Sequence, residues 1–559
     1  MDGLNGVRGA RSGVTAFAKT AVVLAVACLG AGAQAVEIET GNDELNVRWD
    51  NTVKYSAAYR LNNPSATLLS NPNNDDGNRN FGKGIVSSRL DLFSELDVIY
   101  QKTMGLRVSA AAWHDSAYQG SNDNPGFAGG AFPNQSSVPY NQFTAATKKV
   151  HGNNVELLDA FVFGKFDLAG KGTTVRAGRH SLLWGESLFF GANAISGGQM
   201  PVDVVKLLSV PGTQFKEAIR PVPMLSAQTQ LSSNVSVGAY VQTSASKSRV
   251  AAVGSYFSNA DPAVDGGENL LLGPGVPPAA RLADQNAKDS GQGGVQLKVR
   301  GEDVDFGFYA IQFHSKTPQL VPVVGLTPGG PAPIGYRLAY HENVQALGAS
   351  ASKTFGDYNV AAEFSVRNNQ DLASTQGVDV SSFAPAPATN NSSNPGYAVG
   401  RTAHLNVSVL GNLPSTPLWK EGTLLGEVAW NRVLKITKNA AAADPNATRN
   451  GLAFRMLMEP MYRQVFSGVD LGVPIGLGYA PKGSRPLAMS SPNAWIPEGG
   501  GDISIGLNAS YLDAWRFGVN YTHYFGTAKA FNTGTNNAYS YGQTLKDRDF
   551  ISVTARYSF

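Results

Sequence analysis

Asp547-Arg-Asp-Phe-Ile-Ser-Val-Thr-Ala-Arg-Tyr-Ser-Phe559, the stretch that closes the chain, alternates strictly with a period of two residues. One face of this stretch carries only apolar side chains, which are those of Ile551, Val553, Ala555, Tyr557 and Phe559. This period predicts a β-strand over 547–559 whose two faces meet different surroundings. An aromatic residue at the end and another two positions earlier make Tyr557 and Phe559 the candidate signal for closing a β-barrel.

The same two-residue period recurs along the whole chain and predicts further strands. The clearest is 85–101, where Leu90, Leu92 and Leu96 face away from Arg89, Asp91, Glu95 and Asp97. We predict 18 strands, and counts of 16 to 20 fit the pattern: 44–60, 85–101, 104–116, 153–168, 173–182, 222–231, 235–246, 292–301, 303–315, 341–355, 358–370, 400–411, 423–437, 451–463, 468–481, 501–512, 515–527 and 547–559.

The predicted connections alternate between tight turns and long loops rich in Gly, Pro, Asn and Ser. Short inner turns and long outer loops are the rule in transmembrane barrels, whereas a soluble sandwich has no reason to alternate so regularly. The predicted fold class is therefore all-β, an antiparallel transmembrane barrel. The default expectation for the long loops is that they are solvated connections without individual roles.

The beginning of the chain predicts a signal peptide over residues 1–35. Arg8, Arg11 and Lys19 precede an apolar run, and Ala33-Gln34-Ala35 offers a small-x-small cleavage site. The run is too short for a transmembrane helix, and Ala25-Val26-Ala27 before Cys28 is a poor lipoprotein signal. We expect secretion to the cell outer membrane and one barrel domain over 36–559.

Composition excludes several classes of protein. Removing residues 1–35 takes away three basic residues and one acidic residue, which brings the net charge from +3 to about +1. No nucleic acid is expected as a partner, because phosphates demand a basic surface. The single cysteine, Cys28, lies in the predicted signal. We expect no metal, no cofactor and no disulfide.

One loop, 183–221, has too much apolar content for a free connection. It carries Trp184 and Glu186, then a Pro201-led segment with Val204, Leu207 and Leu208 at the spacing of a short amphipathic helix. We predict that this third outer loop folds inward as a constriction, by analogy with other outer-membrane channels. Its candidate residues are Trp184, Glu186, Asp203 and Lys206, and Glu186 is expected to pair with an arginine, Arg176 or Arg179.

Counting alternate positions places many charges inside the barrel. The candidates are Arg89, Asp91, Glu95, Asp97, Arg107, Arg176, Lys298, Arg300, Glu363, Arg367, Glu427, Arg455, Glu459, Arg463 and Arg516. The signs are mixed, so no one-sided basic ladder for anions is present. These residues either brace the wall through cross-strand pairs or bind what passes.

A family resemblance rests on motifs between about residues 155 and 262. They are Leu157-Leu-Asp159, Arg176-Ala-Gly-Arg-His-Ser-Leu-Leu-Trp-Gly-Glu-Ser187, Met200-Pro-Val-Asp203, Pro211-Gly212, Lys216-Glu217, Pro221-Val-Pro-Met224 and Gly254-Ser-Tyr-Phe257 with Asp261. The chain resembles the proteobacterial, porin-like outer-membrane family numbered thirteen-oh-two among domains of unknown function, although His180 stands where many members have Gln.

The resemblance implies a barrel that is often encoded near a second outer-membrane protein of unknown function and RND-type exporters, and hence a part in moving hydrophobic molecules across the envelope. It supplies no catalytic residues. Other expected partners are outer-membrane lipid and lipopolysaccharide, and the barrel-assembly machinery during insertion.

Three other functions were weighed against a channel. An outer-membrane lipase or esterase is disfavoured, because the seven histidines show neither metal spacing nor a nucleophile elbow. They are His114, His151, His180, His314, His341, His404 and His523. A gated receptor would need a plug domain before the first strand. A structural or adhesive barrel that does not conduct is the runner-up, so we expect a channel or porin-like protein for small molecules and no catalytic residues.

Overall fold

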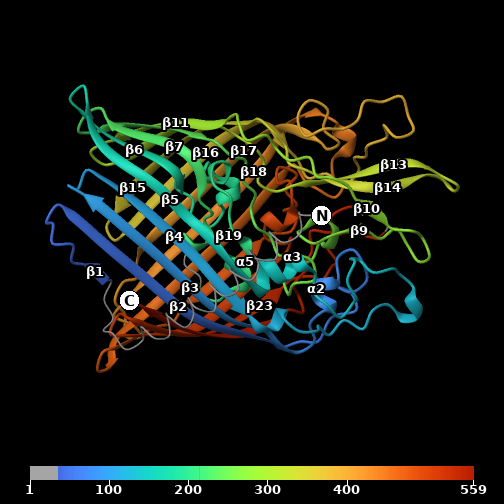
Figure 1. Ribbon diagram of the computed structural model, residues 1–559, viewed down its shortest axis with the longest axis horizontal. Coiled ribbons are helices and arrows are strands. Elements are labelled where there is room, and N and C mark those ends of the chain that lie inside the picture. Colours follow the sequence, from blue (N-terminus) through green and yellow to red (C-terminus); the bar gives the residue numbers. More distant parts are fainter. Residues whose placement is uncertain (1–35, 213–214, 535) are drawn as a thin grey trace, which may run out of the picture.

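A computed structural model describes residues 36–212, 215–534 and 536–559, and their dominant feature is one antiparallel barrel (Figure 1). The predicted signal peptide over 1–35 lies outside these residues. We call each strand that crosses the barrel wall a stave. Of the 20 strands in the sheet, β1 (Val36–Ile38) only extends the rim, and β20 and β21 together form one stave, so the barrel has 18 staves. The predicted fold class and strand count are confirmed.

The staves follow one another around the barrel in chain order. They are β2 (Leu45–Arg60), β3 (Gly84–Tyr100), β4 (Met104–Asp115), β5 (Asn153–Leu168), β6 (Lys171–His180), β7 (Val222–Gln230), β8 (Val235–Gln242), β11 (Gln292–Arg300), β12 (Asp305–Phe313), β15 (Val344–Phe355), β16 (Tyr358–Asp371), β17 (Val399–Asn412), β18 (Glu421–Lys438), β19 (Asn450–Phe466), β20 (Val469–Gly472) with β21 (Ile475–Ala480), β22 (Gly500–Tyr511), β23 (Trp515–Phe525) and β24 (Phe550–Ser558).

The barrel closes between its first and last staves. β2 pairs with β3 on one side and with β24 on the other, from Thr52↔Ser558 to Arg60↔Phe550. Asn51 and Phe559 extend this seam by exchanging backbone hydrogen bonds of 2.7 and 2.9 Å. Beyond the end of β24, β1 continues the pairing along this edge of β2, at residues 47–49. No strand edge is left open along the seam, which is the requirement for crossing lipid.

The two faces of the staves differ as the period-two pattern predicts. On β24, Ile551 and Val553 are about 40% exposed, whereas Ser552 between them is only 2% exposed. The exposed apolar face lies outside, where lipid would cover it, and the polar face lies inside. Among the described residues, none of the helices combines the length and apolar character needed to cross a bilayer.

Pro474 explains the break between β20 and β21. Proline has no backbone N–H for the ladder, and it falls in the gap between Gly472 and Ile475. Gly506 of β22 still donates its N–H to the Pro474 carbonyl at 2.9 Å. The stave is therefore bent and remains paired on both sides.

The long loops gather at one end of the barrel, here the loop end, and the tight turns at the other, the turn end (Figure 1). The loops are more ordered than the sequence suggests. β13 (Gln319–Thr327) and β14 (Gly330–Ala339) form a hairpin that joins β9 (Asn269–Leu270) and β10 (Ala279–Arg281) in a second, four-stranded sheet. The hairpin alternates less regularly than the staves and was missed as secondary structure.

Aromatic packing also joins loops that are distant in sequence. Phe81 of one loop packs against Tyr118 and Phe143 of a second loop and against Tyr256 of a third, with ring centroids 5.7 Å apart in each pair. Tyr118 and Phe143 also pack on each other, 5.0 Å apart. Buried aromatic pairs add about 0.5–1.5 kcal/mol each beyond their area. The expectation that the loops are merely solvated connections is wrong for this cluster.

Short helices complete the described structure. The α-helices are α2 (Asp76–Arg79), α3 (Ala145–Thr147), α4 (Ser196–Gln199), α5 (Val204–Ser209) and α6 (Phe215–Ala218); the 3₁₀ and π turns are η2 (Ser116–Tyr118), η3 (Ala128–Gly130), η4 (Lys148–Gly152), η5 (Gly191–Asn193), η6 (Asp261–Ala263), η7 (Ala440–Ala442) and η8 (Pro492–Ala494).

Candidate functional site

Residues 183–212 and 215–221, here the inner segment, lie against the polar face of the staves. Glu427 of β18 makes the most concentrated contact. One of its carboxylate oxygens accepts the backbone N–H groups of Leu188 at 3.0 Å, of Phe189, and of Phe190 at 3.1 Å. Its other oxygen accepts the amide of Asn406 at 2.7 Å. A buried carboxylate surrounded by N–H donors is stabilised by charge-assisted hydrogen bonds.

Glu363 and Arg367 of β16 hold the next part of the inner segment. Glu363 accepts the backbone N–H of Glu186 at 2.8 Å and that of Ile195 at 2.6 Å. Arg367 donates to the carbonyl of Ala192 at 3.1 Å and to that of Ala194 at 2.8 Å. Three charges predicted to line the lumen are thus covered by the inner segment and bind its backbone.

Apolar side chains fill the space between the inner segment and the wall. Trp184 packs with Tyr240 at 5.0 Å and with Tyr309 at 6.4 Å between ring centroids. The surrounding cluster contains Ile195, Met200, Ile219, Val222, Met224, Ile311, Phe313, Val344 and Ala346. On this side the interior of the barrel is therefore an apolar core, which explains the excess of apolar residues in the loop.

The helix α5 lies within the predicted segment but begins at Val204 and not at Pro201, and its faces differ from the prediction. Asp203 caps it by accepting the Lys206 N–H at 3.0 Å. Val205 and Lys206 are buried, while Leu207 and Leu208 are exposed. The expectation that Leu207 and Leu208 form its packed face is wrong, because the wall beside α5 is charged and attracts Lys206.

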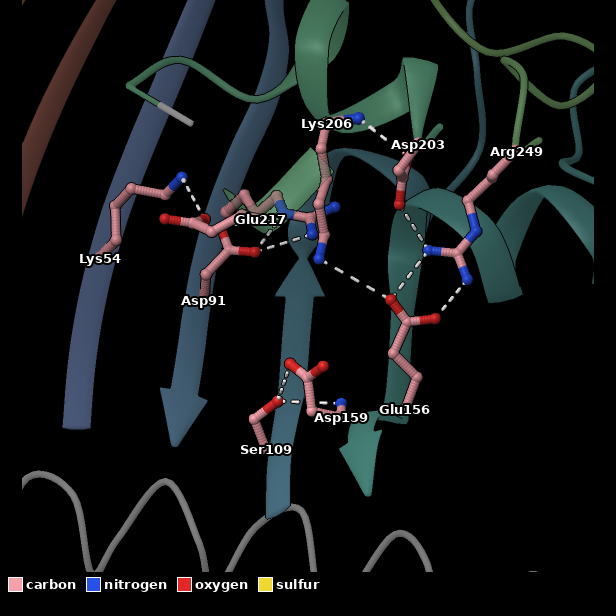
Figure 2. Close-up of polar contacts among 10 residues, drawn as sticks. Lys54, Asp91, Ser109, Glu156, Asp159, Asp203, Lys206, Glu217 and Arg249 are labelled. Atoms are coloured by element: carbon pink, nitrogen blue, oxygen red, sulfur yellow. Dashed lines mark hydrogen bonds and ion pairs between the residues drawn. The ribbon is translucent and has the colours of Figure 1, made fainter. Parts of the chain in front are cut away.

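Figure 2 shows the charged cluster that attaches α5 to the wall. Arg249 donates to Asp203 at 2.7 Å and forms a two-pronged ion pair with Glu156 of β5. Lys206 reaches the same Glu156 carboxylate at 3.7 Å. All four side chains are largely buried, so each charge depends on the others for its partner. Arg89, Lys206 and Arg249 all lie over the ring of Trp113, at 5.0 to 5.9 Å from its centroid.

A second contact in Figure 2 ties the inner segment to β2 and β3. Lys54 of β2 lies 3.9 Å from Glu217. Beside it, Arg89 pairs with Asp91 at 2.7 Å on β3. Further along β4 and β5, Ser109 and Asp159 exchange hydrogen bonds of 3.0 Å. The inner segment is therefore held on two opposite parts of the wall, β2–β5 and β16–β18.

Most remaining charges of the interior connect staves of the wall, either neighbouring ones or, from β19 to β22, across the stave of β20 and β21. Arg107 pairs with Asp97 at 2.6 Å and with Glu95 at 3.6 Å. Arg455 pairs with Asp502 at 2.7 Å. Glu459 accepts from Asn508 at 3.0 Å, and Arg463 contacts Glu421 and Asp470. Such cross-strand pairs stabilise the wall.

Four cations of the interior are different. Arg176, Lys298, Arg300 and Arg516 have no carboxylate within ion-pair distance among the residues that the structure describes. Lys298 and Arg300 line a polar cavity of about 420 Å³, together with Glu186, Gln228 and Asp305. The cavity lies toward the turn end, below the inner segment.

Glu186 does not pair with Arg176 or Arg179, so that expectation is wrong. Its carboxylate is hydrogen-bonded to Ser350 and lies in the field of Lys298. Its backbone attaches it to the wall, through its N–H to Glu363 and its carbonyl to Ser408 at 2.9 Å. Glu186 therefore faces the cavity while the main chain holds the inner segment.

No motif or spacing in the sequence indicates the carboxylate cluster at the loop end. Asp75, Asp76 and Asp261 offer oxygens that lie within 4.8 Å of one another. Burial and the charge of Asp75 raise the pKa of Asp261 to about 7, and burial raises the pKa of Asp75 to about 6, against the opposing effect of Arg79. Only the fold brings these loops together.

His180 and Ser226 form a pair that could suggest catalysis, with Nε2 and Oγ 2.8 Å apart. Its Nδ1 lies 3.1 Å from the carbonyl of Gly178, with no carboxylate there to orient the ring. His180 is only 1% exposed. A Ser–His nucleophile needs access to substrate, and the burial of His180 denies this pair such access.

Comparisons with solved structures find similarities of low sequence identity, with TM-scores below 0.5. OccAB3 of Acinetobacter baumannii is 9% identical with a TM-score of 0.42 and covers 92% of this chain and 99% of its own. OccK1 (OpdK) of Pseudomonas aeruginosa is 9% identical, with a TM-score of 0.38 and coverages of 92% and 98%. OmpF of Salmonella typhi, in complex with daunomycin, is 10% identical, with a TM-score of 0.34 and coverages of 94% and 100%.

A search of curated proteins gives no match. A family model described as "Protein of unknown function (DUF1302)" matches residues 16–559, nearly the whole sequence. The resemblance drawn from the motifs between residues 155 and 262 is thereby confirmed, and the chain belongs to the DUF1302 family.

Proposed function

We propose that the protein is a porin-like channel of the outer membrane for small molecules, hydrophobic ones included, and that the inner segment sets the width of its passage. The observation that carries this proposal is the attachment of the inner segment to opposite walls, by Glu427 and Glu363 on one side and by the Arg249 cluster on the other. A segment held this way restricts a barrel of 18 staves, a size that otherwise leaves an open channel.

Two surfaces below and beside the inner segment support passage. Trp184, Tyr240 and Tyr309 belong to an apolar cluster that could release its contacts to an apolar solute. The polar cavity with Lys298 and Arg300 leads toward the turn end, which is the periplasmic side of an outer-membrane barrel. The proposal includes assistance by a second outer-membrane protein and an RND-type exporter, and includes no catalytic role.

A barrel that does not conduct is the second candidate, favoured by the packing of the loops over the loop end. Phe81, Tyr118 and Phe257 belong to one buried cluster there, and Leu372, Val433 and Leu487 to another. If these loops stay closed, the barrel has a structural or adhesive role.

Planar-bilayer recording separates the two candidates. A channel gives discrete current steps with the wild-type protein, and a variant whose inner segment is released, Glu363→Gln with Glu427→Gln, gives larger steps. Absence of current from both proteins, each correctly folded by its heat-dependent mobility on gels, would favour the barrel that does not conduct.

A further inference from the structure

The outside of the barrel carries a groove of about 910 Å³ over β7, β8, β11, β12, β15 and β16. Its apolar lining includes Leu225, Val241, Val295 and Leu347, which are 53–68% exposed in the absence of lipid. Small residues form its floor, namely Ala227, Ala239, Gly293 and Ala310. A lipid-facing wall is normally lined by bulky side chains, so this region forms a depression where acyl chains can lie.

A row of polar side chains borders the groove toward the loop end. Gln312, Gln345 and Asn368 occupy directly paired positions on β12, β15 and β16. Gln345 also donates to Gln312 at 3.2 Å. Arg401 of β17 continues the row and lines the same groove. The row marks the level at which the apolar surface gives way to a polar boundary.

Two cations meet at the end of this row without a carboxylate. Arg401 and Lys435 are directly opposite on β17 and β18 and are both exposed. Arg432, three residues earlier on β18, is also exposed and donates to Asn450 at 3.2 Å. Throughout the described ranges, none of these three side chains forms an ion pair. Like charges directly opposite on paired strands destabilise a sheet unless an anion lies between them.

We propose that this face binds one lipopolysaccharide molecule of the outer leaflet. Arg401 and Lys435 contact a phosphate of its glucosamine headgroup, Gln345 and Asn368 bind the sugar and amide groups beside it, and the groove receives an acyl chain. Arginine and lysine are the usual partners of phosphate. The apolar groove matches the acyl chain of an anionic lipid, and the cationic residues beside it match the charged headgroup. The inference rests on the proposed location in the outer membrane and does not depend on conduction.

The test compares two double variants that remove the same number of charges from the same part of the wall. Arg401→Gln with Lys435→Gln alters the proposed site. Lys353→Gln with Lys420→Gln alters the turn end of the neighbouring strands and serves as the control. Each barrel is purified from outer membranes in mild detergent, and bound lipopolysaccharide is counted by native mass spectrometry.

The wild-type and control barrels should retain about one lipopolysaccharide each, and the Arg401/Lys435 variant at least fivefold less. Rebinding of phosphorylated lipid A should be lost in that variant, while lipid A without phosphates should bind all barrels equally weakly. Ala310→Phe, which fills the groove, should weaken lipid A binding and leave the fold intact.

Equal retention by both double variants would overturn the proposal. So would efficient crosslinking of two barrels through Leu347→Cys, because a second copy would then cover this face. A barrel that is recovered in the outer membrane but gives no current would contradict the proposed channel function and leave the proposed lipid site standing. A barrel that is absent from the outer membrane would contradict both proposals.

Discussion

The carboxylate of Glu427 accepts the backbone N–H of Phe190 at 3.1 Å, although the two residues are 237 positions apart in the chain. The same oxygen also accepts the N–H groups of Leu188 and Phe189. One wall residue thus fixes three consecutive peptide groups of the inner segment. Its carboxylate is used to hold this segment and not to contact solutes.

Replacing Glu427 by Gln should loosen the inner segment. An amide keeps the shape of the side chain but loses the charge that strengthens its hydrogen bonds, each worth about 1.5–3 kcal/mol. We expect cleavage within residues 184–200 by an added protease to rise about tenfold, which corresponds to about 1.4 kcal/mol. Glu421→Gln, on the same strand at the turn end, is the control and should leave cleavage unchanged.

Glu363 and Glu186 should respond differently to the same substitution. Glu363→Gln removes the acceptor of two backbone N–H groups and should increase single-channel conductance. Glu186→Gln changes a side chain that faces Ser350 and Lys298, so it should alter ion preference with little effect on protease protection. Equal loss of protection in the two variants would show that the Glu186 side chain also holds the segment.

Removing Arg249 should destabilise the wall around α5. Arg249→Met leaves Asp203 and Glu156 facing each other in a largely buried cluster, and loss of one partner of a buried ion pair typically destabilises by about 3–5 kcal/mol. The barrel should lose its heat-resistant gel mobility at a lower temperature. Arg463→Met removes an exposed pair and should lower that temperature far less.

The packing of the loops should weaken as the pH rises from 5 to 8. The pKa of Asp261 is raised to about 7 and that of Asp75 to about 6, so the packed loops hold protons that open loops release. Their contribution to stability is complete below about pH 4, near the ordinary carboxyl pKa, and is lost as the pH passes through 6 and 7. The nearby charges are Asp76, Arg79 and Arg548.

Hydrogen exchange of residues 61–83 and 251–267 measures this effect. Exchange in the wild type should be faster at pH 8 than at pH 5 after correction for the intrinsic rate. Asp261→Asn should remove most of the difference. Asp265→Asn, at an exposed position of the same loop, should keep it; a wild type with no such dependence would contradict the prediction.

Deleting Phe559 should impair insertion more than conductance. Phe559 exchanges two backbone hydrogen bonds with Asn51 at the seam and packs on Tyr557 with ring centroids 5.4 Å apart. We expect a marked fall in folded barrel at the cell surface, measured by surface labelling, and unchanged current from the molecules that insert. Phe559→Tyr should insert normally. Normal surface levels with altered current would contradict this role.

The staves could be predicted because their signal is local. In a strand with one exposed face, apolar and polar side chains alternate every two residues. This alternation predicts a strand over 153–168, which are the bounds of β5. The prediction for the closing strand begins three residues too early, because Asp547, Arg548 and Asp549 precede β24. These residues bind the loops instead, as when Arg548 donates to the carbonyl of Ser258 at 2.8 Å. Charged side chains alone do not reveal such distant partners.

The inner segment could be located from its composition, but its contacts could not be predicted. Alternation correctly placed Glu363, Arg367 and Glu427 on the polar face, and the structure shows that they bind peptides about 170 to 240 residues away. Almost every residue offers a backbone N–H and every residue a carbonyl, so a sequence does not show which of these groups a side chain will bind. The same reason explains the error for Glu186, where an arginine seemed the natural partner and the main chain took that role.

The β13–β14 hairpin has a practical consequence for work on living cells. Its tip at Pro328–Gly329 lies beyond the barrel at the loop end, and nothing lies within 4 Å of the place where a Cβ on Gly330 would be (Figure 1). In the proposed orientation, with the loop end outside the cell, antibodies added to intact cells would reach a short epitope inserted at this tip, and the insertion would not disturb the wall.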